Sequence, residues 1–124
     1  MNNKIVTVNY ANLDFTVDFT KRGIPEVSCL GKTLKPIFNR KLSRYHYSIY
    51  LTNEQAEKVP GSSRLANGYG AMLHVYRYRI ISAALEVLHG KPFNYEEFSK
   101  MQTDHIDNDP TNDNPSNLRI VTRQ

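Results

Sequence analysis

The chain of 124 residues contains a single cysteine, Cys29, and no long apolar run. One cysteine cannot form an internal disulfide bond, and it cannot supply the ligands of a cysteine-rich zinc site. A bilayer-spanning helix needs about 20 consecutive apolar residues, and the N-terminus lacks the apolar core of a signal peptide. We therefore expect a cytoplasmic protein that is neither secreted nor membrane-bound.

Positive charge is concentrated in the middle of the chain, although the net charge is only +4. Five basic residues follow one another with no acidic residue between them: Lys32, Lys35, Arg40, Lys41 and Arg44. Acidic residues gather near the other end: Glu96, Glu97, Asp104, Asp107, Asp109 and Asp113. A basic surface that attracts phosphates, beside an acidic pocket that binds a cation, is what a nuclease requires. The alternative is a solvated basic face without a partner.

Alternation of apolar and polar side chains predicts several strands. The odd-numbered residues from Leu13 to Phe19 would face the core, and residues 11–12 would form a hairpin turn. The strands are expected at residues 4–10, 13–19, 26–30, 33–38, 45–51 and 71–76. Pro25 and Pro36 confine the third and fourth of them to edge positions or short strands, because proline has no N–H to donate.

Three segments have helix signals. Thr52 and Gln55 fit a capping box that opens a short helix. Residues 78–89 carry apolar side chains at helical spacing, and Gly90 follows as a stop. Asn94 could cap a third short helix. With a returning pair of strands at 101–107 and 118–122, the sequence predicts an α+β fold with N-terminal strands, a central helix and a C-terminal hairpin. A β-rich region at 1–70, with a possible DNA-binding surface, and a helix-plus-motif region at 71–124 would form one compact domain.

The segment 103–122 carries the strongest chemical signal. His105 could act as a general base, because an ordinary imidazole titrates near pH ~6.5. Asp104 could be an oxygen ligand for a hard cation such as Mg²⁺. Neighbouring side chains of a strand point to opposite faces, so the two can serve one substrate only from different directions or across a bend. Asn117 could hydrogen-bond across the hairpin and fix both the loop and the imidazole.

Other interpretations of this segment are weaker. An EF-hand that starts at Asp107 would need glycine at Asn112 and glutamate at Leu118. His46, His74 and His89 are scattered and are expected to be surface or packing residues. A polar hairpin loop with no chemistry remains the structural alternative.

The run from Asp104 to Asp107, the loop around Asn112, and Asn117-Leu118-Arg119 with the Ile-Val-Thr that follows resemble the HNH endonuclease family, especially its phage-borne and intron-encoded homing members. The resemblance implies a ββα-metal fold in which Asp104 is a metal ligand, His105 is the general base and Asn117 braces the hairpin. It also implies Mg²⁺, or Mn²⁺, as cofactor and double-stranded DNA as substrate.

The chain departs from the family pattern at its end. The third signature residue lies on a helix after the second strand, just beyond Gln124. Three explanations stay open. The first is that the sequence is truncated. The second is that another acid, such as Asp107 or Asp109, or a neighbouring subunit substitutes for the missing ligand. The third is that the protein binds DNA without cutting it.

From these observations we expect a phage-encoded, metal-dependent DNA endonuclease that works in the bacterial cytoplasm. The alternative is an inactive HNH-like protein that binds DNA or inhibits another protein. The oligomeric state and the target site stay open. The residues expected to contact DNA are Lys32, Lys35, Arg40, Lys41, Arg44, Arg77, Arg79 and Arg119, and Arg123 could also reach phosphates.

Overall fold

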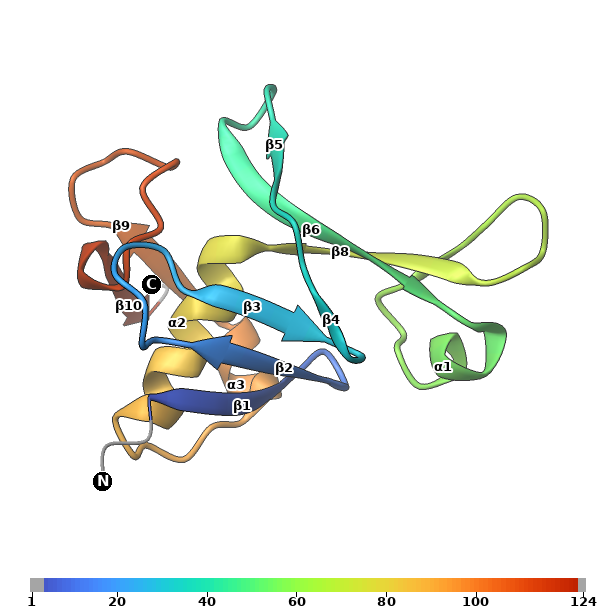
Figure 1. Cartoon of the computed structure of the whole chain (residues 1–124), viewed down its shortest axis with the longest axis horizontal. Helices are drawn as coiled ribbons and strands as arrows, with labels where there is room; N and C mark the ends of the chain where they lie inside the picture. The colour runs from blue at the N-terminus through green and yellow to red at the C-terminus, as the bar shows by residue number, and fades with distance from the viewer. Residues whose placement is uncertain (1–3, 123–124) are drawn as a thin grey trace.

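In a computed structural model that describes residues 4–122, the alternating N-terminal segments form an antiparallel sheet (Figure 1). Its strands, in spatial order, are β1 (Ile5–Tyr10), β2 (Leu13–Asp18), β3 (Glu26–Cys29) and β4 (Lys32–Thr33). The expected turn between the first two is confirmed, because Ala11 and Asn12 both have positive φ, 54° and 68°. That conformation matches the twist of a two-residue hairpin. The inward-facing Phe15 and Val17 are completely buried.

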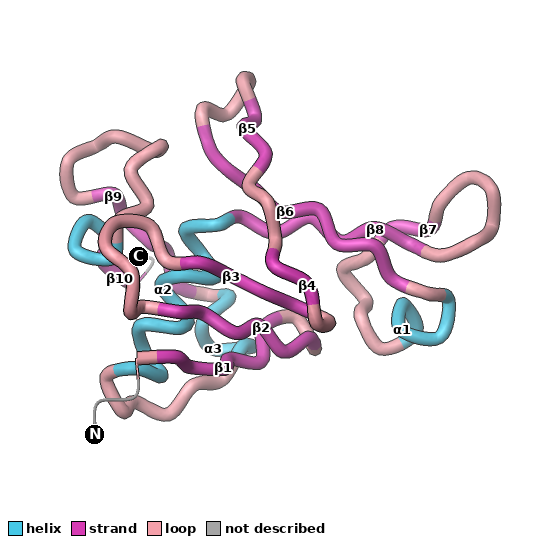
Figure 2. Tube along the Cα trace, in the orientation of Figure 1, coloured by secondary structure: helices cyan, strands magenta, loops and turns pink. Residues whose placement is uncertain are grey.

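A second antiparallel sheet extends away from the first, as Figure 2 shows. Its strands, in spatial order, are β5 (Ile37–Asn39), β6 (Arg44–Leu51), β8 (Ala71–Tyr76) and β7 (Ser63–Arg64). The prediction of a single strand at 33–38 that pairs with 26–30 was wrong. β4 pairs with β3 and β5 pairs with β6, and Pro36 lies between them. Proline cannot continue a ladder of hydrogen bonds, so the chain changes sheets there.

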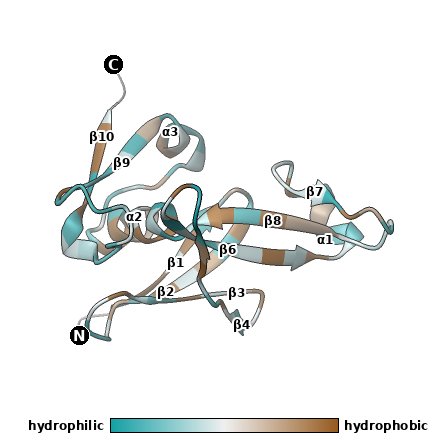
Figure 3. Ribbon diagram, turned by 90° about the horizontal axis from the view of Figure 1, so that it is seen from above, coloured by the Kyte–Doolittle hydropathy of each residue, from teal (hydrophilic) through white to brown (hydrophobic). Residues whose placement is uncertain are grey.

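The central helix α2 (Arg77–Leu88) begins and ends one residue before its predicted bounds. Ile80, Ile81, Ala83 and Ala84 are completely buried, and the helix packs against β1 and β2 on one side. Against its other side lies a C-terminal hairpin of β9 (Met101–His105) and β10 (Leu118–Thr122), as the view from above shows (Figure 3). The helix thus forms the middle layer.

Two short helices begin at their predicted caps. Thr52 and Gln55 form the expected capping box at the start of α1 (Asn53–Glu57). The side chain of Asn94 accepts a hydrogen bond from the Glu97 N–H at the start of α3 (Tyr95–Ser99). Among the residues described, no helix is long and apolar enough to cross a membrane. The α+β class is confirmed.

Candidate active site

The polar loop that joins β9 to β10 is organised by its own side chains. Four of its side-chain oxygens each accept a hydrogen bond from the backbone N–H two residues further on: those of Asp107, Asp109, Asn112 and Asn114. Such Asx turns hold a chain in tight bends without regular secondary structure. A one-turn helix, η1 (Pro115–Asn117), then leads into β10. Four of the Asn and Asp residues of this loop therefore have a local structural function, and Asp113 is not one of them.

Asn117 braces this loop from within. Its side chain is buried, and its Oδ1 accepts a hydrogen bond from the Asp107 N–H at 3.0 Å. Its Nδ2 donates to Asp107 Oδ1 and to the Asn112 carbonyl oxygen, both at 2.9 Å. Asn117 therefore holds the two ends of the loop together, as its position in the motif suggested. It makes no hydrogen bond to His105, so the imidazole is oriented by another group.

That group is Asp113. Its carboxylate is completely buried, and Oδ1 lies 2.8 Å from His105 Nε2. The Tyr78 ring packs on the imidazole, with 5.0 Å between the ring centroids. The His105 side chain is only 7% exposed. It is fixed by a carboxylate on one edge and an aromatic ring on one face.

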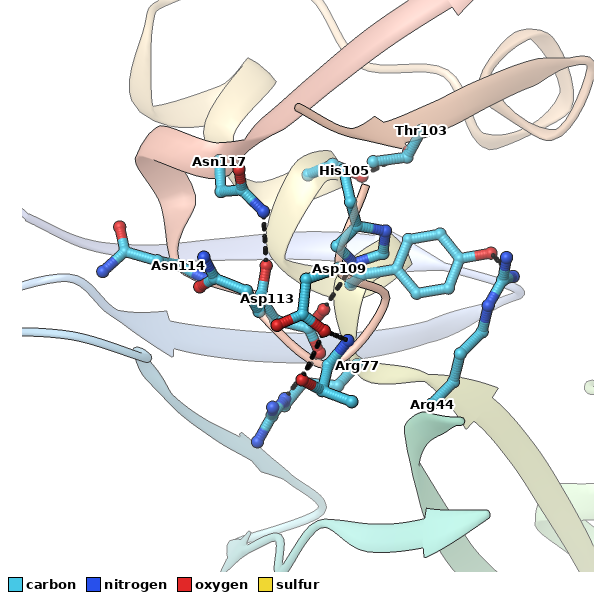
Figure 4. A network of polar contacts seen from close by, with 12 residues as sticks. Arg44, Arg77, Thr103, His105, Asp109, Asp113, Asn114 and Asn117 are labelled. Atoms are coloured by element: carbon cyan, nitrogen blue, oxygen red, sulfur yellow. Dashed lines mark hydrogen bonds and ion pairs between the residues drawn. The ribbon is translucent and has the colours of Figure 1, made fainter. Parts of the chain in front are cut away.

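The second oxygen of Asp113 binds Arg77. Arg77 Nε donates to Oδ2 at 2.8 Å, and the guanidinium lies over the Tyr45 ring, 4.1 Å from its centroid. Arg77, Asp113 and His105 thus form a continuous buried network, which Figure 4 shows. We expected Arg77 at a DNA-binding surface, but its side chain is 8% exposed and paired inside the protein. It is not available to DNA in this conformation.

Asp104 lies in a different environment from its neighbour. β9 is regular through His105, so the two side chains point to opposite faces. Asp104 Oδ2 lies 3.4 Å from Nη2 of Arg119, its cross-strand partner, and both side chains are largely in solvent. Asp104, His105 and Asn117 therefore have separate partners and do not converge on one point. The backbone does not bend between Asp104 and His105. The two side chains could therefore serve one substrate only by approaching it from different directions.

The described residues do not form a cage for a divalent cation. Within residues 4–122, no group of three or more His, Cys, Asp or Glu side chains is placed to hold a metal. The expected substitutes are otherwise engaged: Asp107 binds Asn112 and Asn117, and Asp109 binds Thr111. Among the described residues, Asp104 would thus be a single carboxylate with no second ligand beside it. A lone carboxylate leaves Mg²⁺ mostly hydrated.

A polar cleft of about 320 Å³ runs along β9 beside Asp104. Arg44 and Tyr78 lie at one end, where Arg44 Nη1 donates to Tyr78 Oη at 2.8 Å. Burial raises the pKa of Tyr78, so the phenol stays protonated at neutral pH. Arg79 also lines the cleft and donates to Thr103 Oγ1 and to the Phe98 carbonyl oxygen. Two cationic side chains, Arg44 and Arg79, therefore line the cleft together with Tyr78, whose ring packs on His105.

The other basic residues that we expected to contact DNA lie on the surface. Lys32, Lys35, Arg40 and Lys41 are all exposed, as is Arg119. Arg123 lies outside the described residues. That any of them contacts DNA stays a prediction.

Asn112 is expected to control the acidity of Asp107. The hydrogen bond from Asn112 is the main cause that lowers the Asp107 pKa, followed by bonds from the Asp109 backbone and from Asn117. Asn112→Ala should therefore raise this pKa toward its ordinary value, which is measured by carboxyl ¹³C titration in NMR. A lowered folded-state pKa adds stability that is present above the unfolded-state pKa and is lost as pH falls through the folded-state pKa. The stability difference between variant and wild type should accordingly vanish in acid.

Asp18 is the matched control for this titration. Its pKa is also lowered, by hydrogen bonds from Thr20 on a different hairpin. It should be unchanged in the Asn112 variant. An Asp107 pKa that stays in place would show that the loop, and not Asn112, sets it.

Comparison with known families gives one match. The family model described as HNH endonuclease matches residues 95–124, which include α3, β9, the polar loop and β10. The resemblance drawn from Asp104, His105 and Asn117 is confirmed over that segment. No curated protein and no solved structure matches the chain.

Proposed function

We propose that the protein is an HNH-type endonuclease that hydrolyses phosphodiester bonds of double-stranded DNA, with His105 as the general base. The observation that carries this proposal is the buried network in which Arg77 of α2 pairs with Asp113, and Asp113 with His105, the last two lying in the segment that matches the HNH family model. A buried ion pair is costly to desolvate and seldom improves stability over apolar packing. An imidazole held by such a pair is more simply explained by a need for its orientation and basicity.

The hydrogen bonds indicate how His105 would work. A carboxylate only accepts hydrogen bonds, so we assign the proton of this contact to His105 Nε2, which would donate it to Asp113 Oδ1. The lone pair then lies on Nδ1, which has no hydrogen-bond partner among the described residues. Nδ1 would take a proton from the attacking water. The Asp113 carboxylate would stabilise the imidazolium that forms, and the Arg77 guanidinium would hold that carboxylate in place.

Other residues would position the substrate. Arg44 and Arg79 could contact phosphate oxygens in the polar cleft, since guanidinium groups match phosphate geometry. A divalent cation, most simply Mg²⁺, would neutralise charge on the phosphate. Asp104 is the one residue we assign to it, and the described residues do not complete the site.

The second candidate is a protein that binds nucleic acid without cutting it. It is favoured by the contact of Asp104 with Arg119, which occupies the carboxylate with a cation of the protein itself. The same surfaces would then serve binding or inhibition of another protein. A phage origin and a bacterial cytoplasmic location are part of the first proposal and rest on the resemblance alone.

A plasmid assay separates the two candidates. Purified protein should nick or linearise supercoiled plasmid with Mg²⁺ or Mn²⁺, and excess chelator should stop the reaction. Asp104→Asn keeps the shape of the side chain but should need more metal for the same rate. Asp14→Asn is the matched control, because Asp14 is also an exposed strand residue. Plasmid that stays intact with every metal, while DNA binding is retained, would establish the second candidate.

A further inference from the structure

The hairpin formed by β5 and β6 stands beside the loop between β9 and β10 (Figure 1). Its strands end in the cross-strand pair Asn39 and Arg44, and residues 40–43 form the turn. The turn is defined by Ser43, whose φ is 51°, and by a hydrogen bond from the Leu42 N–H to Asn39 Oδ1 at 3.1 Å. Arg40, Lys41 and Leu42 are exposed at this tip.

The charge on this hairpin has one sign. No acidic residue occurs between Glu26 and Glu54, which includes the hairpin and the strands that lead into it. Arg40 and Lys41 at the tip are exposed and have no ion pair among the described residues. An element whose charged side chains are all positive is complementary to the phosphates of a duplex.

Apolar side chains are exposed on the same hairpin. Ile37 is 46% exposed, Phe38 is 43% exposed and Leu42 is 50% exposed. Leu42 lies in the turn itself, between the two basic residues and Arg44. Proteins that bend DNA often insert such an apolar side chain between base pairs while neighbouring cations contact the backbone.

The hairpin is also connected to the candidate active site. Arg44, at the base of the turn, donates a hydrogen bond to Tyr78, and the Tyr78 ring packs on His105. A duplex that is bound by the tip would therefore pass close to the imidazole. This continuity favours nucleic acid over an unrelated partner as the occupant of the hairpin.

We propose that the β5–β6 hairpin is a DNA-binding finger, in which Arg40 and Lys41 contact phosphates and Leu42 inserts between base pairs and bends the duplex. The proposal rests on the proposed function in that its ligand is double-stranded DNA. It adds the element that grips the duplex and the deformation that it imposes. Insertion of this kind bends DNA by about 20–90°.

Binding and bending are measured on a duplex of ~25 base pairs in the presence of chelator, so that no cleavage is needed. Fluorescence anisotropy at several salt concentrations gives the affinity and its salt dependence. Arg40→Ala with Lys41→Ala should weaken binding on the order of tenfold and reduce the salt slope by about 2. Lys91→Ala with Lys100→Ala is the charge-matched control, because both lysines are exposed away from the hairpin. Equal weakening by the two pairs would overturn the role of the finger.

Bending is followed by energy transfer between dyes at the two duplex ends. Leu42→Ala should abolish the bend and weaken binding a few-fold, whereas Leu30→Ala, which changes an exposed leucine on another turn, should do neither. An unchanged bend in the Leu42 variant would refute insertion. The alternative partner of the hairpin is a second copy of the chain, and sedimentation of the wild type and of Leu42→Ala without DNA tests it. If Leu42→Ala converts a dimer to a monomer, the hairpin binds a second copy and the proposal fails.

The test of the DNA-binding finger is independent of the test of nuclease activity. If the protein binds and bends DNA through this hairpin but cuts no plasmid, the finger stands and the nuclease assignment falls. If it cuts plasmid while the hairpin variants bind and bend normally, only the finger is wrong.

Discussion

Asp113→Asn is expected to destabilise the protein by about 3–5 kcal/mol, because removal of one partner from a buried ion pair leaves the other charge uncompensated. Arg77 is buried, and its Nε has Asp113 Oδ2 as its partner at 2.8 Å. An amide at position 113 is too weak an acceptor to replace the carboxylate. The free energy of unfolding is obtained from urea denaturation monitored by circular dichroism.

Two further variants make this measurement specific. Asp109→Asn changes an exposed acid of the same loop, whose side chain accepts hydrogen bonds from Thr111, and should cost no more than about 0.5 kcal/mol. Arg77→Met combined with Asp113→Asn should be less destabilising than the sum of the single changes, with a coupling of about 0.5–3 kcal/mol. If Asp113→Asn unfolds at the same urea concentration as Asp109→Asn, the ion pair does not hold the loop.

The network that these variants test could not be predicted from the sequence. Arg77 and Asp113 are 36 residues apart, and their contact depends on how α2 docks against the C-terminal hairpin. We counted Asp113 among the acids of the C-terminal end and Arg77 among the DNA contacts. One feature distinguishes Asp113 from Asp107, Asp109, Asn112 and Asn114: its side chain forms no Asx turn. That difference is seen only in the structure.

Local features were predictable because they depend on neighbouring residues. The turn at Ala11 and Asn12, the caps at Thr52 and Asn94, and the end of α2 near Gly90 were all read from short patterns. The division of residues 33–38 between two sheets was not, since pairing partners are set by tertiary packing. Pro36 nevertheless marked the place where a strand had to stop.

The residues of the candidate site were proposed from the sequence, and their geometry could not be predicted from it. Asp104, His105 and Asn117 were identified by their resemblance to HNH endonucleases, and the matched segment includes all three. We expected them to surround one cation. The structure gives them three separate partners, namely Arg119, Asp113 and the loop backbone. Because side chains alternate along β9, Asp104 and His105 point to opposite faces. The side chain of Asn117 is bonded to the loop between β9 and β10.

His105→Ala is expected to lower the rate of plasmid cleavage by about 10²–10⁴-fold, the usual contribution of a general base. The change removes the nitrogen that would accept the proton from water. It also opens a space between Tyr78 and Asp113, which contact the imidazole from its face and its edge. Added neutral imidazole could occupy that space and act as the base. If the variant is slow because it lacks a general base, the cleavage rate should partly recover in ~50 mM imidazole.

The control for this variant is His89→Ala, because His89 is exposed at the end of α2 and contacts none of the network. It should cut at the wild-type rate. Anisotropy with the same duplex should show that His105→Ala still binds, since the proposed role of the imidazole is proton transfer and the phosphates would be contacted by basic residues elsewhere. Cleavage by His105→Ala at the wild-type rate would mean that the activity belongs to another group. Loss of both cleavage and binding, with no imidazole rescue, would mean that His105 supports the fold of the loop and performs no proton transfer.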